Sequence, residues 1–462
     1  MTIPDSVTHV GDSAFAACRG LTTVKIGKGL KEIGKDAFNY CLNIKSVYYA
    51  DMESLCNMKG LNNLTSGRDK QIYISGNLFT DFIFAGNIEN VPDYAFYNCG
   101  NILSFTMRGG KKIGESAFND CNSLERVTIE NVERIGKSAF EYCGNLTSLT
   151  IGEGVKIIED YAFNGCYNIE EIVIPESVQE IGNRAFYGCK NLKKLTIKNS
   201  KCTINKDAFG ASEMKIADVP AEFIEYFDSS KLQELNIISG ETISDNALYG
   251  CKTLKKITIL SSVKNIGKYG FMYCDNLDTI VADKDNATYY SKNNCLIEKT
   301  TQKLMLGCQS SVIPAEVKSI GDYAFCGASG LTRITFPEGL ESIGEHAFAE
   351  CKNLNNPIIP SGVKNIGEYA FAWCFSITDV TIPDGVDKIS KGLFYSCDSL
   401  VGVTIPQSVT AIDADAFKYC EKLAKIDFKG TTAEWNKITK GNNWNLKVSS
   451  NFKVNCLGDA DA

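Results

Sequence analysis

Apolar and polar positions alternate in short runs along this chain, and the runs recur every 22 or 23 residues. In each run, L-x-x-V-x-I places two apolar side chains two positions apart, which is the spacing of one face of a β-strand. The residue between them is most often threonine, whose branched side chain suits the half-exposed face of a strand. The pattern therefore predicts short strands with one buried face and one outer face. The outer threonines are Thr106, Thr128, Thr150, Thr196, Thr258, Thr335, Thr381 and Thr404.

A second signature follows each predicted strand. The consensus of one unit is L-x-x-V-T-I-P-x-x-V-x-x-I-G-x-x-A-F-x-x-C-x-N, and it is unbroken over residues 331–428. Proline ends the strand because it lacks an N–H, and V-x-x-I-G predicts a shorter extended piece that leads into a tight turn with A-F-x-x-C. The Ala-Phe pair aligns fourteen phenylalanines, called anchors below, and Leu248 fills one further slot. The anchors are Phe15, Phe38, Phe96, Phe118, Phe140, Phe163, Phe186, Phe209, Phe271, Phe325, Phe348, Phe371, Phe394 and Phe417.

A unit of this length cannot enclose a core by itself, so successive units must stack and bury one continuous core. We expect a solenoid of stacked parallel strands with short turns or helices, built from about 15 anchored repeats of 22–23 residues. An alanine precedes the anchor in thirteen of the fifteen slots, which predicts that the next coil approaches too closely there for a larger side chain. We expect the solenoid over residues 1–428, with irregular insertions at 48–90, 210–247 and 281–313.

Each insertion has a local signature. Asp51 suits the N-cap of a helix over MESLCNM in the first. In the second, Pro220 suits the first turn of a helix on which Phe223, Ile224 and Phe227 share one face. The third, ADKDNATYYSKNNCLIEKTTQKLMLGCQSSVIP, predicts an enlarged coil that carries a hairpin.

The C-terminal segment, residues 429–462, resembles the first insertion in layout. Thr431 with Glu434 fits a capping box for a short helix. The segment also brings Trp435 and Trp444, and a solenoid must cover its final apolar layer. These features predict a C-terminal cap and tail.

Thirteen of the nineteen cysteines lie three places after an anchor. This register predicts an inward ladder of free, buried thiols that behave as small apolar side chains. Neighbouring coils bring such cysteines within disulfide distance, but side chains that point in parallel meet disulfide geometry poorly. Of the six cysteines outside the ladder, Cys295 and Cys308 form the pair to test. The ladder comprises Cys18, Cys41, Cys99, Cys121, Cys143, Cys166, Cys189, Cys251, Cys274, Cys351, Cys374, Cys397 and Cys420.

Composition argues against several classes of protein. Lys+Arg number 48 and Asp+Glu 55, for a formal charge of -7, and no basic run is long enough to follow a phosphate backbone, so no nucleic acid is expected. No stretch approaches the roughly 20 apolar residues that cross a bilayer. The start, MTIPDSVTHVGDSAF, lacks the layout of a signal peptide. Because TIPDSV is the second half of a repeat, we expect an upstream segment, and the missing signal says little about export.

Candidate chemistry is sparse. There is no C-x-x-C, and His9 and His346 lie far apart, so we expect neither a metal nor a cofactor. The segment DKDNAT lacks the glycine at position six and the glutamate at position twelve of a calcium loop. No Ser-His-Asp set or phosphate-cradling glycine motif is present, and His346, in GEHAF, is expected to face solvent. The sequence predicts no enzymatic activity.

The units resemble those of the BspA-like family of bacterial leucine-rich repeats, which carry the pattern I-P-x-x-V-x-x-I-G-x-x-A-F-x-x-C-x-x-L. The resemblance covers nearly the whole chain, and the ending W-N-x-I-x-K-G-x-N-W-N at residues 435–445 also looks like the family. It implies a β-rich leucine-rich-repeat solenoid of the right-handed α/β horseshoe class. It also implies an exported surface protein that attaches to host proteins or other cells, and it brings no catalytic motif and no transferable ligand-binding residue.

Two roles remain open at this point. The first is an extracellular or cell-surface recognition and adhesion protein, a monomer, that binds a host matrix protein, a cell-surface protein or other bacteria through its solenoid surface. The second is a passive spacer that presents another domain of a larger surface protein. Outer threonines and aromatic residues at the breaks are candidate contacts, although strand propensity and packing over the coil edge also explain them. The candidates are Thr128, Thr150, Thr196, Thr258, Tyr48, Tyr49, Tyr289 and Tyr290.

Overall fold

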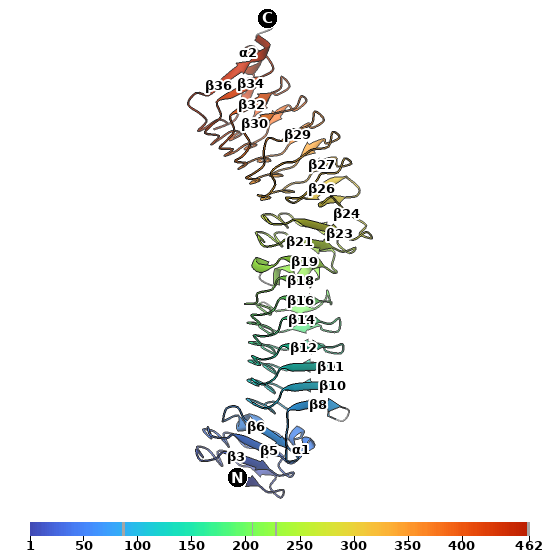
Figure 1. The fold of residues 1–462 in the computed structure, drawn as a ribbon, viewed down its shortest axis with the longest axis vertical. Helices are drawn as coiled ribbons and strands as arrows, with labels where there is room; N and C mark the ends of the chain where they lie inside the picture. Colours follow the sequence, from blue (N-terminus) through green and yellow to red (C-terminus); the bar gives the residue numbers. More distant parts are fainter. Residues whose placement is uncertain (86–87, 206, 227–228, 460–462) are drawn as a thin grey trace. The chain divides into compact units, whose positions relative to one another are not determined.

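The structure, a computed structural model, describes residues 1–85, 88–205, 207–226 and 229–459. The chain forms two compact units, Met1–Asp228 and Ser229–Ala462. Figure 1 shows that each unit is a stack of short coils. A regular coil contains a strand of about four residues, a strand of two residues and a tight turn. Stacked parallel strands with little helix confirm the predicted solenoid.

In the first unit, the longer strands pair in parallel with their equivalents one coil away, and so do the short ones. The longer strands are β1 (Thr2–Ile3), β3 (Thr23–Ile26), β5 (Ser46–Tyr49), β6 (Gln71–Ile74), β8 (Asp81–Ala85), β10 (Ser104–Ile113), β11 (Arg126–Ile135), β12 (Ser148–Ile151), β14 (Glu171–Ile174), β16 (Lys194–Ile197) and β18 (Ile216–Val219). The short strands are β2 (His9–Val10), β4 (Glu32–Ile33), β9 (Asn90–Val91), β13 (Ile157–Ile158), β15 (Glu180–Ile181) and β17 (Thr203–Ile204), and β7 (Asn77–Leu78) makes a hairpin with β6. The helical segments are α1 (Met52–Cys56), η1 (Leu61–Leu64) and η2 (Ala221–Tyr226).

The second unit repeats this plan around an enlarged coil. Its longer strands are β19 (Glu234–Ile237), β21 (Lys256–Ile259), β23 (Thr279–Ala282), β30 (Asp379–Thr381), β32 (Gly402–Ile405), β34 (Lys425–Phe428) and β36 (Lys453–Cys456). Its short strands are β20 (Thr242–Ile243), β22 (Asn265–Ile266), β27 (Ser319–Ile320), β28 (Ser342–Ile343), β29 (Asn365–Ile366), β31 (Lys388–Ile389), β33 (Ala411–Ile412) and β35 (Thr439–Lys440). The enlarged coil contains β24 (Tyr289–Lys292), β25 (Cys295–Glu298) and β26 (Lys303–Leu306), and the helical segments are η3 (Ser229–Lys231), α2 (Thr432–Trp435) and η4 (Leu457–Asp459).

The register of the strands builds the core in columns. Phe105 pairs with Val127, and Met107 pairs with Ile129, so that equivalent inward positions lie on top of each other. All four side chains are buried. Because of this pairing, residues that are one repeat apart in the sequence pack on each other in the interior.

The anchor rings form the most regular of these columns. From Phe118 to Phe209, successive rings stack with centroids 5.1–5.3 Å apart and interplanar angles of 2–4°. From Phe325 to Phe417, the centroids are 4.9–5.8 Å apart at 6–10°. Phe15, in the first coil, is only half-buried. The remaining stacked rings are sealed between their neighbours, as the sequence predicts.

Backbone hydrogen bonds join the anchor turns of successive coils. The N–H of Phe140 donates to the carbonyl of Ala162 at 2.7 Å, and the N–H groups of Ser138 and Tyr142 donate to the same neighbouring coil. Ser138 and Tyr142 both have left-handed backbones, with φ of 52° and 59°. A left-handed conformation costs an L-residue roughly 1–2 kcal/mol, and the bonds to the next coil offset that cost. The next coil approaches the alanine before the anchor closely, as expected, and the contact is made by main-chain atoms.

The ladder cysteines have a role that the sequence does not reveal. The Sγ of Cys143 donates to the carbonyl oxygen of Phe118 at 3.2 Å, and Cys166 does the same to Phe140. A thiol is therefore small enough for the column and still gives the anchor carbonyl a weak donor. All nineteen cysteines are free thiols, including Cys295 and Cys308.

The insertions mostly keep their predicted elements. Asp51 caps α1, where it accepts from the N–H of Ser54 at 2.8 Å, and the hairpin coil is confirmed by the antiparallel pairing of β24, β25 and β26. The predicted helix at Pro220 is the 3-10 helix η2, with Phe223 and Ile224 buried. Phe227 lies outside the described residues.

The C-terminal segment adds one more coil. The predicted capping box of Thr431 and Glu434 opens α2. Trp435 packs on Phe428 with ring centroids 5.4 Å apart, and Trp444 packs on Phe417 at 6.2 Å. These two indoles cover the end of the aromatic column.

Substituting an anchor should weaken the first unit strongly. Phe186 has no solvent exposure and lies between two stacked rings, so Phe186→Ala should lower the free energy of unfolding by about 3–5 kcal/mol. Urea denaturation measures this change. The control is Tyr40→Ala in the same unit, where an aromatic ring that is 64% exposed is removed, and its effect should stay within about 0.5 kcal/mol. Equal effects at both positions would contradict the stacked column.

The thiols should react according to burial. Burial raises the pKa of Cys189 and Cys420 to about 12, so their reactive thiolate hardly forms near neutral pH. With a thiol reagent and no reductant, the unfolded protein should titrate 19 thiols. In the native protein, only the exposed Cys18 should react at once, before the half-buried Cys56 and Cys456. Two missing thiols after unfolding would reveal a disulfide.

Candidate binding surfaces

The outer threonine row lies where the sequence places it. Thr106, Thr128 and Thr150 pair with one another across β10, β11 and β12. Thr150 is exposed, whereas Thr128, Thr196 and Thr258 are half-buried. The Oγ1 of Thr196 donates to a carboxylate oxygen of Asp218 at 3.3 Å. The row therefore offers a regular line of hydroxyls on the outer face of the strands.

The structure corrects two of the four candidate tyrosines. Tyr49 and Tyr289 are buried in the core, at 4% and 3% exposure. Tyr49 occupies the inward isoleucine slot of its repeat, and the hydroxyl of Tyr289 donates to the carbonyl of Lys264 at 3.1 Å. Neither ring can contact a partner in this fold.

The other two tyrosines lie at the surface but already have partners. Tyr48 stacks on Tyr73 with ring centroids 4.2 Å apart, and its ring also faces the ammonium of Lys25. The hydroxyl of Tyr290 donates to Gln302 at 2.9 Å. Both residues remain available as partial contacts.

In the second unit, residues 331–337 and 354–360 depart from the regular strand pairing and from the polar outer face of the repeat. Pro357 takes an inward slot of the consensus and has no N–H to donate, and a single parallel bridge joins Thr335 to Ile358. Ile358 stands in the outer threonine slot and is 86% exposed. A large apolar side chain thus points to solvent where the repeat normally places a hydroxyl.

Two hollows flank Ile358. One, of about 540 Å³, extends from Ile334 and Phe336 to Thr378. The other, of about 350 Å³, includes Gly402 in its lining. A Cβ atom at Gly402 would lie 2.9 Å from a carboxylate oxygen of the neighbouring strand, so glycine keeps this second hollow open. We call Ile358 with these two hollows the Ile358 surface.

One pair of opposite charges lies at the rim of the Ile358 surface. Asp427 accepts from the Lys425 ammonium at 2.7 Å and from the Asn455 amide at 2.7 Å. These hydrogen bonds hold the pKa of the Asp427 carboxyl below its usual value, the Lys425 bond being the larger cause. An apolar centre with a polar, satisfied rim has the anatomy of a protein interface.

His346 is half-buried, whereas the sequence suggested a side chain that faces solvent. Its ring lies between the rings of Tyr323 and Tyr369, with both centroid distances at 5.0 Å and interplanar angles of 10° and 12°. The three residues hold the same left-handed position of successive anchor turns, so their side chains stack. Burial in this stack lowers the pKa of His346.

Lys70 is a buried cation that sequence reasoning missed. It is 3% exposed, and its ammonium donates to the carbonyls of Leu64 and Thr65 at 3.3 and 3.2 Å. The ring of Tyr97 lies 5.7 Å away, and burial lowers the pKa of Lys70 to about 8. Its polar surroundings in the sequence, TSGRDKQ, carry no signal of burial. These contacts hold the end of η1 against the coil that contains Lys70.

Groups suited to other chemistry are already used or do not come together. The Asn286 side chain, in the calcium-like segment, is buried, donates to Leu260 and Val263 and accepts from Thr288 and Tyr289. Within the described ranges, no three His, Cys, Asp or Glu side chains gather closely enough to hold a metal ion. Among the same residues, no helix has the length and apolar character to cross a membrane.

The stacked coils and the repeated unit define a leucine-rich repeat protein. A family profile described as BspA type leucine rich repeat region, with six copies, matches residues 1–58, 62–170, 89–215, 224–301 and 296–424. These matches span most of the sequence, and the chain therefore belongs to the BspA type leucine-rich repeat family. Repeat proteins of this fold offer extended surfaces for protein interaction.

A comparison with solved structures found similar chains. The chain is similar to a leucine rich cell surface protein from Faecalibacterium prausnitzii, with 26% identity, a TM-score of 0.41, and coverage of 79% of this chain and 92% of that one. It is similar to a leucine-rich repeat protein from Eubacterium ventriosum, with 22% identity, a TM-score of 0.38, and coverage of 76% and 83%. It is also similar to the pneumococcal vaccine antigen PcpA, with 18% identity, a TM-score of 0.37, and coverage of 94% and 93%. A search of curated proteins found no match.

Protonation of His346 should weaken the second unit. Because the folded-state pKa lies below the ordinary value of about 6.5, the unfolded state binds the proton more readily. The stability contributed by neutral His346 is therefore complete above that ordinary value and is lost as pH falls through the folded pKa. His346→Phe keeps a ring in the stack and cannot titrate. Between pH 7.5 and 5, the wild type should lose more unfolding free energy than the variant.

The control for this comparison is His9→Phe in the first unit, where the histidine side chain is largely exposed. It measures what a surface histidine contributes to the same pH scan. Parallel pH profiles for the wild type and His346→Phe would contradict the half-buried, neutral ring.

Proposed function

We propose that this protein is a non-enzymatic recognition and adhesion protein, secreted or held at a cell surface, and that its second unit binds a partner protein through the Ile358 surface. The observation that carries the proposal is the 86% exposure of Ile358 between two hollows. Burying one such side chain in a complex contributes about 1.5–3 kcal/mol. That gain favours association over leaving the side chain in water.

The surroundings of Ile358 support a protein partner over a small molecule. The two hollows share Asn356 and Ile358 in their linings, and the apolar residues near Ile358 are flanked by polar and charged side chains, among them the paired Lys425 and Asp427. Central apolar side chains with a satisfied polar rim supply most of the energy in protein interfaces. Family membership points to host matrix proteins, cell-surface proteins or other bacteria as partners.

The outer threonines extend this proposal along each unit. Thr128, Thr150 and Thr196 in the first unit and Thr258 in the second present a regular grid of hydroxyls. Such a grid can add polar contacts to a bound partner. The passive spacer stays the alternative role, and it requires no binding at either surface.

The test is binding of the purified full chain to immobilised extracellular-matrix proteins and to whole bacterial cells, with biolayer interferometry for the isolated proteins. For any partner that binds the wild type, Ile358→Lys should weaken affinity at least about tenfold, which corresponds to about 1.4 kcal/mol. The side chain is exposed, so the substitution should leave the unfolding midpoint unchanged.

Ile83→Lys is the matched control, because Ile83 stands in an outer slot of β8 in the first unit and is 71% exposed. It should bind as the wild type does. A second variant with Lys at Thr150, Thr196 and Thr258 tests the threonine grid in the same assay. Unchanged binding by Ile358→Lys would remove the Ile358 surface, and no wild-type binding to any partner would favour the spacer.

A further inference from the structure

The hydrogen bonds between anchor turns are interrupted at one place in the second unit. In the preceding coil, the N–H groups of Asn246 and Leu248 donate to the next coil at 3.0 and 2.8 Å. Tyr269 and Phe271 hold the same two positions one coil later, yet neither N–H has an acceptor among the described residues. Phe271 is also 8% exposed, whereas the five later anchors are at most 1% exposed. Two main-chain donors and the edge of a ring are left open.

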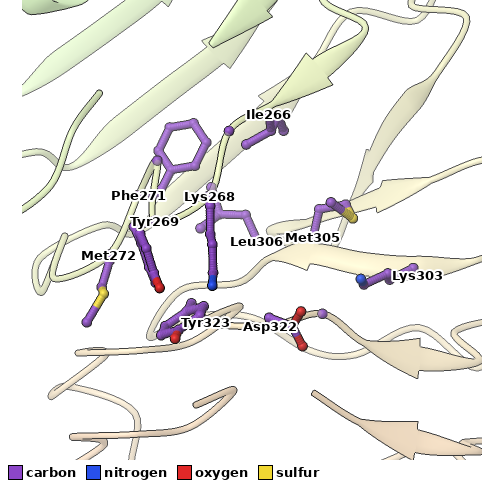
Figure 2. A pocket seen from close by; sticks show the side chains of 13 residues that line it. Ile266, Lys268, Tyr269, Phe271, Met272, Lys303, Met305, Leu306, Asp322 and Tyr323 are labelled. Atoms are coloured by element: carbon purple, nitrogen blue, oxygen red, sulfur yellow. The ribbon is translucent and has the colours of Figure 1, made fainter. Parts of the chain in front are cut away.

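The hairpin coil causes this opening. The N–H of Gly307 donates to the carbonyl of Ala324 at 2.8 Å, and by the rule of the repeat that carbonyl would accept from Phe271. A Cβ atom at Gly307 would lie 2.1 Å from the ring of Phe325, so only glycine can follow β26 here. The strands β22 and β26 consequently belong to separate sheets. Figure 2 shows the space that remains between residues 266–272 and the segment from β26 to Tyr323.

The space is a cavity of about 230 Å³ with a positive rim and an apolar floor. Figure 2 shows that the ammonium ends of Lys268 and Lys303 and the carboxylate of Asp322 meet at it. No ion pair joins Lys303 to a carboxylate of the described residues, whereas Asp322 already accepts from a backbone N–H at 2.8 Å. Phe271 and Met305 also line the cavity.

These groups suit an anion attached to an apolar body. Open main-chain N–H groups can donate to an anion, and Tyr269 and Phe271 supply two of them on either side of Gly270, whose own N–H donates to Gly267 at 3.2 Å. The cavity lining contains two lysines and one carboxylate, and Glu345 also interacts with the Lys268 ammonium. The Lys303 ammonium is therefore left to face an anionic group with a single negative charge. The apolar floor leaves room for a short aliphatic side chain.

We propose that this cavity binds the C-terminal carboxylate of a peptide that ends in an aliphatic residue. The carboxylate accepts from the N–H groups of Tyr269 and Phe271 and faces the ammonium of Lys303. The terminal side chain lies against Phe271 and Met305. This site is separate from the Ile358 surface, and it stands or falls independently of the proposed function.

Isothermal titration calorimetry on the full chain tests the proposal with N-acetyl-leucine, N-acetyl-leucinamide and inorganic phosphate. N-acetyl-leucine should bind at least about tenfold more tightly than the amide and the phosphate, because only it combines one negative charge with an aliphatic side chain. Lys303→Gln should weaken its binding about tenfold. Equal binding of the amide would overturn the proposal, and so would tighter binding of phosphate.

Lys391→Gln is the matched control. Lys391 precedes its anchor by three residues, as Lys268 does, but in its coil Gly392 and Phe394 donate normally to the next turn. This variant should bind N-acetyl-leucine as the wild type does. An equal loss in both lysine variants would point to non-specific charge attraction and contradict the site.

Hydrogen exchange followed by mass spectrometry gives an independent readout. Peptides that cover residues 266–272 should exchange faster than those that cover residues 244–250, in which the N–H groups of Asn246 and Leu248 donate to the next coil. N-acetyl-leucine should slow exchange in the first set, and N-acetyl-leucinamide should not. Protection of residues 266–272 in the free protein would contradict the open donors.

Discussion

The structure depends on main-chain hydrogen bonds that run from each anchor turn to the next coil. Each anchor is flanked on both sides by a left-handed residue. These residues point every second N–H group along the stack, and carbonyls of the neighbouring coil accept from them. Side chains as different as those of Ser138, Tyr161 and Arg184 hold this conformation. The neighbouring coil supplies the stabilisation, since local propensity opposes it. Where a coil is covered by the next one, the main-chain donors of its anchor turn are therefore satisfied.

The period of the sequence was sufficient to predict the strands, the anchor column and the helix caps, because these depend on burial and on local capping. The left-handed turns and the thiol bonds were not predictable, because their partners lie in another coil. The prediction that Tyr49 is a surface contact was wrong for a different reason. This residue stands two places after Val47 in the inward register, and the strand period alone would have placed it inside.

The candidate surfaces were only partly predictable. The outer threonines follow directly from the consensus, but Ile358 differs from it by one residue and looks like ordinary variation in the sequence. Its exposure becomes visible only when Pro357 is seen to interrupt the ladder. Likewise, the open N–H groups at Tyr269 and Phe271 follow from where the hairpin inserts. Where the repeat is regular, the polar groups of the stack satisfy one another, and groups free to bind arise at the irregular coils.

The thiol ladder has a consequence for how such a protein matures. Most of the ladder sulfurs are held against a carbonyl of the preceding coil, and all nineteen cysteines are free thiols. Folding therefore needs no oxidising catalyst and no choice among competing cross-links. A chain built this way can keep one architecture in both reducing and oxidising compartments, because its stability depends on packing and hydrogen bonds instead of on cross-links.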